Sequence, residues 1–177
     1  PSFVVIQAGT RVMETRNIGT FESPVRIANE LPPEIQIPQM IKICNKYGIF
    51  MKEHNTDYLS TESLKWQPRL GIHAANIAPE FGVAETKSFL DILQQNGLTK
   101  LSDEFLRISY DSMQWKKWML KDTNASDRDR SIIAGHYVFA NDDFIELKAK
   151  ANAKINNLDN KLKSKLKESI SRYINAF

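Results

Sequence analysis

Strand-like and helical patterns alternate along the first hundred residues. Continuous apolar runs at residues 3–6, 49–51 and 70–72 are expected to be buried strands. The segments after them carry apolar residues at helical spacing, which predicts helices from about residue 40 to Gly48, from Ser60 to about Pro68, and over residues 79–95. Three such units in succession favour parallel strands joined by right-handed crossovers. The polar stretch 10–29 has little periodicity and is expected to be a long loop.

The rest of the chain has a helical pattern, over residues 101–120, 126–139 and 141–177. We therefore predict two parts, a strand-and-helix part at residues 1–98 and a helical extension at residues 99–177. The last helix carries an apolar stripe at steps of three and four: Ile155, Leu158, Leu162, Leu166, Ile170, Tyr173 and Phe177. Its other face is rich in lysine, which is typical of a solvated face over a packed stripe. A subunit contact or attraction to an anionic partner is the alternative.

Composition narrows the class of protein only slightly. The formal charge is +3 over 177 residues, and no aromatic residues are interleaved with the C-terminal lysines, so we expect no nucleic-acid partner. No apolar run is long enough to span a membrane. The single Cys44 excludes a disulfide framework and favours a reducing compartment, so a cytoplasmic protein is expected. Because the chain opens at Pro1 inside a strand-like run, we expect it to come from a longer protein.

Polar residues cluster where two of the predicted strands end. Glu53, His54 and Asp57 follow the second strand, and His73 follows the third. Catalytic groups of (β/α)₈ barrels lie at the carboxyl ends of strands. The pattern therefore predicts an α/β fold of the TIM-barrel type, with catalytic residues His54, Asp57 and His73. The alternative for each histidine is a structural hydrogen bond in a polar loop.

One of these clusters and a later helix carry groups that bind metals and anions. Glu53 and His54 could hold a divalent cation such as zinc, although their spacing matches no standard zinc motif. Arg130, one turn into a helix capped by Ser126, could bind a phosphate or carboxylate in bidentate fashion. Equally, Asp127 and Arg130 could pair with each other at positions i and i+3. The sequence leaves these two readings of Arg130 open.

Several runs together resemble a known family. His54-Asn55-Thr56-Asp57-Tyr58, the strand Phe3–Gln7 with Gly9, the helix at residues 81–93, and Ser126-Asp127-Arg128-Asp129-Arg130 resemble, in order and spacing, the carboxyl-terminal half of the class II D-tagatose-bisphosphate aldolase accessory subunit family, the GatZ/KbaZ type. The resemblance covers nearly the whole chain up to about Phe139. It implies the last three strands of a (β/α)₈ barrel followed by an appended helical region.

The resemblance also implies a role in ketose-phosphate metabolism. The full-length protein would be a lyase or epimerase, performing aldol cleavage or 4-epimerisation with a divalent metal. His54, Asp57 and His73 would move protons, Gln7 and Asn76 would contact the sugar, and Arg130 would hold its phosphate. The alternative is a non-catalytic scaffold that stabilises a partner aldolase subunit or forms a homo-oligomer. Two runs from the family's amino-terminal half, Gly-Asp-His-Leu-Gly-Pro and Leu-Asp-Ala-Ser, do not occur here, so we expect about half of an active site.

Overall fold

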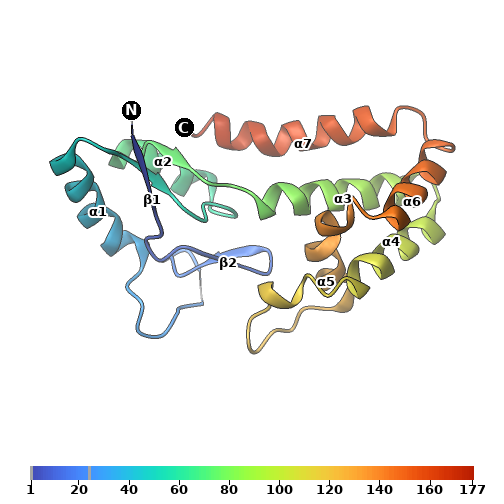
Figure 1. Ribbon diagram of the computed structural model, residues 1–177, viewed down its shortest axis with the longest axis horizontal. Helices are drawn as coiled ribbons and strands as arrows, with labels where there is room; N and C mark the ends of the chain where they lie inside the picture. Colours follow the sequence, from blue (N-terminus) through green and yellow to red (C-terminus); the bar gives the residue numbers. More distant parts are fainter. Residues whose placement is uncertain (1, 24) are drawn as a thin grey trace. The chain divides into compact units, whose positions relative to one another are not determined.

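Two compact units make up the protein. The computed structural model describes residues 2–23 and 25–177, so the expectations for Pro1 and Pro24 fall outside the described residues. Unit 1 comprises residues up to Ala78 together with Arg172–Phe177, and unit 2 is Pro79–Ser171 (Figure 1). We expected a boundary after residue 98, whereas the chain passes from unit 1 to unit 2 between Ala78 and Pro79.

A three-stranded parallel sheet forms the centre of unit 1. Its strands are β1 (Phe3–Ile6), β4 (Phe50–Glu53) and β5 (Ala74–Ala75), in the order β1-β4-β5. The register places Val5 beside Lys52 and Lys52 beside Ala74. The carboxyl ends of the three strands therefore lie at the same edge of the sheet, as the alternation of strands and helices predicts.

A short hairpin interrupts the segment that we expected to be a loop. Strands β2 (Arg11–Met13) and β3 (Arg16–Ile18) pair antiparallel. Three residues per strand are too few to show an alternating pattern in the sequence. The Asn17 amide anchors the hairpin by donating to the carbonyl oxygens of Asn55, at 2.7 Å, and Asp57, at 2.8 Å.

Helices α1 (Pro33–Tyr47) and α2 (Thr61–Leu70) complete unit 1. The Ser60 side chain caps α2 by accepting from the backbone N–H of Ser63. Helix α2 continues to Leu70, so the prediction of a strand at residues 70–72 was wrong; the strand follows at Ala74–Ala75. The core beside the sheet contains Ala8, Ile37, Cys44, Met51 and Ile72, so the cysteine is buried.

The expectation of a TIM-barrel fragment was wrong. The described residues are mostly helical and contain one three-stranded parallel sheet and one two-stranded hairpin. A closed barrel needs about eight strands with a consistent tilt, which three short strands do not supply. Phe3, Val5 and Phe50 are 50%, 54% and 37% exposed, so the sheet face that carries them is open.

Unit 2 is helical. Its elements are α3 (Pro79–Gln95), α4 (Thr99–Asp111), η1 (Lys116–Trp118), α5 (Asp127–Ala134), η2 (Gly135–Val138), α6 (Asp142–Asn152) and α7 (Leu158–Ile174), of which the last residues belong to unit 1. The single helix expected from residue 141 to the end is instead two helices. The break contains Asn157, whose φ of 58° does not continue an α-helix.

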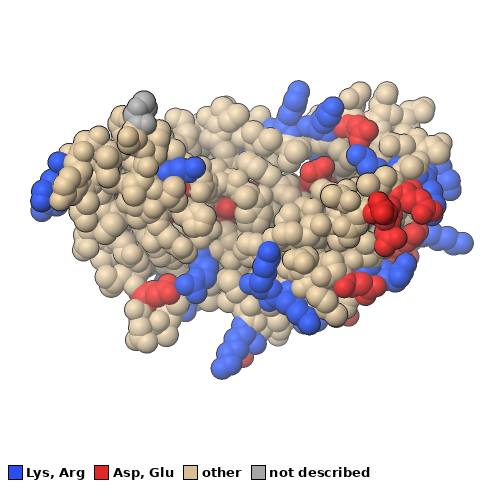
Figure 2. Space-filling model, in the orientation of Figure 1, with Lys and Arg blue, Asp and Glu red and all other residues tan. Residues whose placement is uncertain are grey.

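Charged side chains of both signs cover unit 2. Figure 2 shows acidic and basic groups interspersed over α4 and α6 and basic groups along α7. Ion pairs join Lys148 to Asp159 at 2.7 Å and Lys165 to Glu168 at 3.3 Å. Along the apolar stripe, Leu158 and Leu162 are 1% and 6% exposed and belong to the core of unit 2, whereas Phe177 at its end is 43% exposed. The first part of the stripe is therefore packed, as the pattern predicts. Within the described residues, no helix is both apolar enough and long enough to cross a membrane.

Two glycines allow close packing inside unit 2. A β-carbon at Gly82 would lie 2.4 Å from Cγ of His136, and one at Gly135 would lie 2.4 Å from Cγ2 of Thr86. We expect Gly82→Ala to lower the free energy of unfolding by about 1–3 kcal/mol, since the methyl group overpacks a buried contact. Urea denaturation measures the change. A helix position without this contact would instead gain about 1 kcal/mol from alanine, so a stabilised variant would contradict the prediction.

Candidate functional site

The candidate site lies at the carboxyl end of the sheet in unit 1. Gln7 follows β1, His54 follows β4, and Asn76 follows β5. The backbone holds these ends together: the N–H of His54 donates to the carbonyl of Ile6, and the N–H of Asn76 donates to the carbonyl of Glu53, both at 2.9 Å. Polar side chains from three strands therefore converge on one edge.

Glu53 is a buried acid at this edge. Its side chain is fully buried, its Oε1 lies 3.0 Å from the Thr10 hydroxyl, and its Oε2 has no hydrogen-bond partner among the described residues. Burial raises the pKa of Glu53 to about 7, although hydrogen bonds from Thr10 and from the backbone of Ala8 act in the opposite direction. Burial thus favours the protonated form of this carboxyl group.

The Thr10 hydroxyl joins the loop after β1 to the end of β4. It is the donor both to Oε1 of Glu53, at 3.0 Å, and to the carbonyl oxygen of His54, at 2.6 Å. A hydroxyl has one hydrogen to donate, so the two acceptors share it.

The expected metal site at Glu53 and His54 does not fit this arrangement. Metal ligation needs a deprotonated carboxylate, whereas Glu53 is buried, hydrogen-bonded and inclined to keep its proton. Among residues 2–23 and 25–177, no group of three or more His, Cys, Asp or Glu side chains is placed to hold a metal ion.

Asp57, expected to be catalytic, supports the backbone. It is 1% exposed, and its Oδ1 accepts a hydrogen bond of 3.0 Å from the N–H of Ala78. Its carbonyl also accepts from the Asn17 amide. The carboxylate thus joins the loop after β4 to the segment that leaves β5, and its catalytic role stays a prediction.

His54 and Asn76 form the accessible polar pair of the site. Both are half-buried, and Nδ2 of Asn76 lies 3.2 Å from Nδ1 of His54. When the amide donates this bond, Nδ1 is the acceptor and the ring proton is on Nε2. The imidazole then presents an N–H to a ligand.

His73 does not join this pair. It precedes β5, its ring packs 4.5 Å from that of Phe50, and its Nδ1 accepts a 3.4 Å hydrogen bond from the N–H of Met51. Met51 is three residues before His54, which corresponds to about 10 Å along a strand. The predicted pairing of His54 with His73 rested on the wrong strand bounds.

The sequence analysis assigned no role to Lys52. Its side chain is half-buried on β4 and has no ion pair or hydrogen bond within the part of the chain that the structure describes. Alternation along β4 places Lys52 on the same face as the exposed Phe50 and opposite Glu53. Neighbouring residues of a strand face opposite sides, so the sequence alone would place Lys52 on the outer face once Glu53 is known to face the core. Lys52 brings an unpaired positive charge close to His54.

The remaining predicted contacts lie apart from the pair. Gln7 is exposed and, with Gly9, lines a hollow of about 400 Å³. Arg130 belongs to unit 2, where its Nη1 lies 3.0 Å from Oδ1 of Asp127 and its guanidinium lies 5.1 Å from the Trp115 ring centroid. The structure therefore contains the i, i+3 ion pair, which the sequence left open against a phosphate contact.

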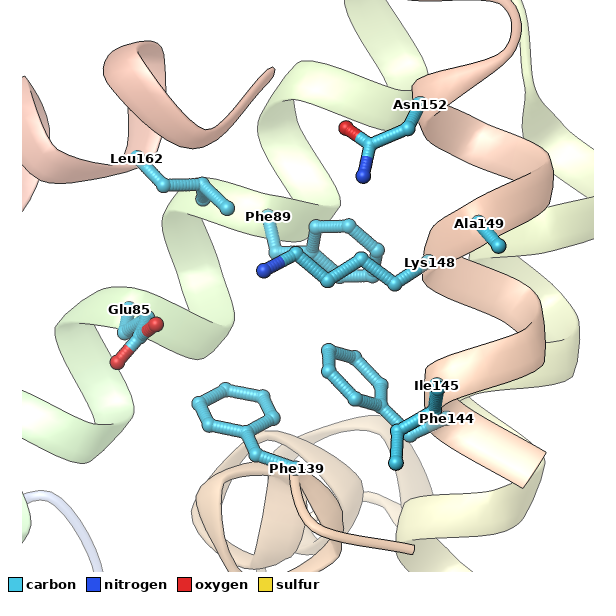
Figure 3. A pocket seen from close by; sticks show the side chains of 9 residues that line it. All are labelled: Glu85, Phe89, Phe139, Phe144, Ile145, Lys148, Ala149, Asn152 and Leu162. Atoms are coloured by element: carbon cyan, nitrogen blue, oxygen red, sulfur yellow. The ribbon is translucent and has the colours of Figure 1, made fainter. Parts of the chain in front are cut away.

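Unit 2 contains a separate apolar pocket of about 430 Å³ (Figure 3). Phe89, Phe139 and Phe144 form much of its lining, and Lys148 extends across them toward its ion pair with Asp159. Glu85 also lines the pocket and has no ion-pair partner in the described part of the chain. The pocket is therefore lined mainly by apolar side chains and offers few polar contacts.

Comparison with known proteins shows a distant likeness in fold. No family model matches the sequence, and no curated protein gives a significant match. The crystal structure of a probable tagatose 6 phosphate kinase from Sinorhizobium meliloti 1021 aligns with a TM-score of 0.65 at 12% sequence identity. The alignment covers 99% of this chain and 52% of that one. The chain is thus similar in fold to about half of that protein.

Proposed function

We propose that unit 1 binds a phosphorylated ketose at the carboxyl end of its sheet and that the protein acts in sugar-phosphate metabolism. The observation that carries the proposal is the His54–Asn76 pair, 3.2 Å apart, next to a lysine without a counter-ion. The resemblance to the tagatose-bisphosphate aldolase accessory subunit family supports the choice of ligand. So does the fold similarity to a probable tagatose 6 phosphate kinase.

Each group has a distinct part in binding. The Lys52 ammonium attracts the phosphate, because an unpaired cation on a half-buried face interacts more strongly than one in bulk water. The Nε2–H of His54 donates to the ketose carbonyl or an adjacent hydroxyl, while Asn76 fixes the ring. In aldol cleavage or 4-epimerisation, this N–H would stabilise negative charge on the carbonyl oxygen.

A non-catalytic scaffold for a partner aldolase is the second candidate. The observation in its favour is the open sheet face with Phe3, Val5 and Phe50 exposed, since exposed apolar patches mark interaction sites. The first part of the stripe of α7 gives no such support, because Leu158 and Leu162 belong to the core of unit 2. Co-elution with a candidate aldolase in size-exclusion chromatography, unchanged by His54→Ala, would favour this function.

Calorimetric titration with D-tagatose 6-phosphate tests the proposal. We expect Lys52→Met to weaken binding about tenfold, because a charge-assisted contact is lost, and to leave the weaker binding of unphosphorylated D-tagatose unchanged. His54→Ala should weaken both sugars. Lys154→Met, at an exposed position of unit 2, is the matched control. Equal affinity of the native protein and Lys52→Met for the phosphorylated sugar would refute the assignment.

A further inference from the structure

A second pocket of unit 1 lies between α1 and α2. Its volume is about 320 Å³, at the small end of the range for ligand pockets. The apolar lining comes from α1, from α2 and from the segment before α2: Pro33, Ile37, Pro38, Leu59, Trp66 and Leu70. Trp66 and Leu70 are 50% and 48% exposed, so the pocket has an apolar rim as well as an apolar interior.

Two buried polar side chains lining this pocket lack partners. Thr20 is 4% exposed and Gln67 is 5% exposed, and both line the cavity. None of the residues that the structure describes forms a hydrogen bond to Oγ1 of Thr20 or Oε1 of Gln67. Burial of an unpaired polar group costs free energy that a bound ligand can recover. The two groups therefore mark the polar contacts of a site.

The lining also restricts the chemistry of the ligand. Glu34 is the charged residue of the lining, and its carboxylate would repel an anion. The negative charge of Glu34 and the apolar walls therefore exclude a sugar phosphate, which is the ligand proposed for the strand ends. A ring-sized apolar body would fill the space, while one hydroxyl could donate to Gln67 and accept from Thr20.

We infer that this pocket is a second ligand site, which takes a small neutral alcohol with an apolar ring. The inference does not depend on the function proposed for the strand ends. Thr10 connects the two places, because it lines the pocket and is hydrogen-bonded to Glu53. Binding in the pocket can nevertheless be tested separately from sugar binding, because the pocket uses Gln67 and Thr20 whereas the proposed sugar site uses Lys52, His54 and Asn76.

Fluorine NMR of 4-fluorobenzyl alcohol with the full chain tests the site. We expect binding with a Kd of about 1 mM or below and roughly tenfold weaker binding of 4-fluorotoluene, which lacks the hydroxyl. Gln67→Leu and Thr20→Val remove the polar contacts at nearly constant volume and should lower affinity for the alcohol but not for 4-fluorotoluene. Trp66→Ala should weaken both. Tyr47→Ala, an exposed aromatic of α1 outside the pocket, is the control.

Three results would overturn the inference. The alcohol could fail to bind at millimolar concentration, it could bind equally to all variants, or the signal could follow protein self-association instead of ligand concentration. Circular dichroism of each variant verifies that it folds. Retained binding of D-tagatose 6-phosphate by Gln67→Leu would show that the two sites are independent, so that failure of one proposal leaves the other standing.

Discussion

Replacing Glu53 with glutamine is expected to raise the free energy of unfolding by about 3 kcal/mol at pH 8 and to leave it nearly unchanged at pH 4.5. Glutamine is neutral at both pH values and keeps the shape of the side chain. Its amide can donate to the Thr10 hydroxyl while Thr10 donates to the carbonyl of His54, so this contact is kept without a charge. Urea unfolding of both proteins across this pH range measures the difference.

The direction of the pKa shift determines whether stability falls or rises with pH. Burial raises the pKa of Glu53 from 4.5 to about 7, so between these values the folded state holds a proton that the unfolded state has lost. Stability then falls as pH rises through this window, because the unfolded state binds fewer protons. Above pH 7 the folded state contains a buried carboxylate and carries the full cost. The glutamine variant lacks this slope.

Glu22 is a control residue for which replacement by glutamine should change stability in the opposite direction. Burial tends to raise its pKa, but hydrogen bonds from Ser60 and Ser63 outweigh burial and lower the pKa overall. Glu22→Gln should therefore reduce stability at neutral pH instead of increasing it. Parallel pH profiles for the native protein and Glu53→Gln would show that Glu53 does not titrate with the raised pKa.

Replacing Phe105 with alanine is expected to cost about 3–5 kcal/mol of stability. Phe105 is fully buried at the centre of unit 2, with its ring centroid 5.2 Å from that of Phe89 and 5.3 Å from that of Phe144. Removal of the ring leaves a cavity and deletes both aromatic contacts. Thermal and urea denaturation should show the loss.

The matched control for Phe105 is an exposed phenylalanine. Phe21 is 61% exposed, so Phe21→Ala should change stability by no more than about 0.5 kcal/mol. Comparable losses for the two variants would mean that Phe105 does not occupy the core of unit 2.

Local signals in the sequence located several elements correctly. Helix α3 has the bounds that its periodicity predicts, Ser60 and Ser126 cap α2 and α5, and Gly48 ends α1. Caps and helical periodicity act between residues a few positions apart, so the sequence carries them directly. The hairpin, the two-residue β5 and the break before α7 were missed, because their strands or turns are too short to leave a pattern.

The residues of the candidate site also divide into those that local signals in the sequence identified and those that only the tertiary structure brought together. That polar groups follow the second strand, from Glu53 to Tyr58, was readable from the sequence alone, since the apolar run before them is local. Which groups meet was decided by the register of three separated segments, which brings Asn76 to His54 and places His73 beside Met51. Tertiary packing likewise buried Glu53 and Asp57 and left Lys52 unpaired. Strand pairing and burial depend on contacts distant in sequence, and only the folded structure determines them.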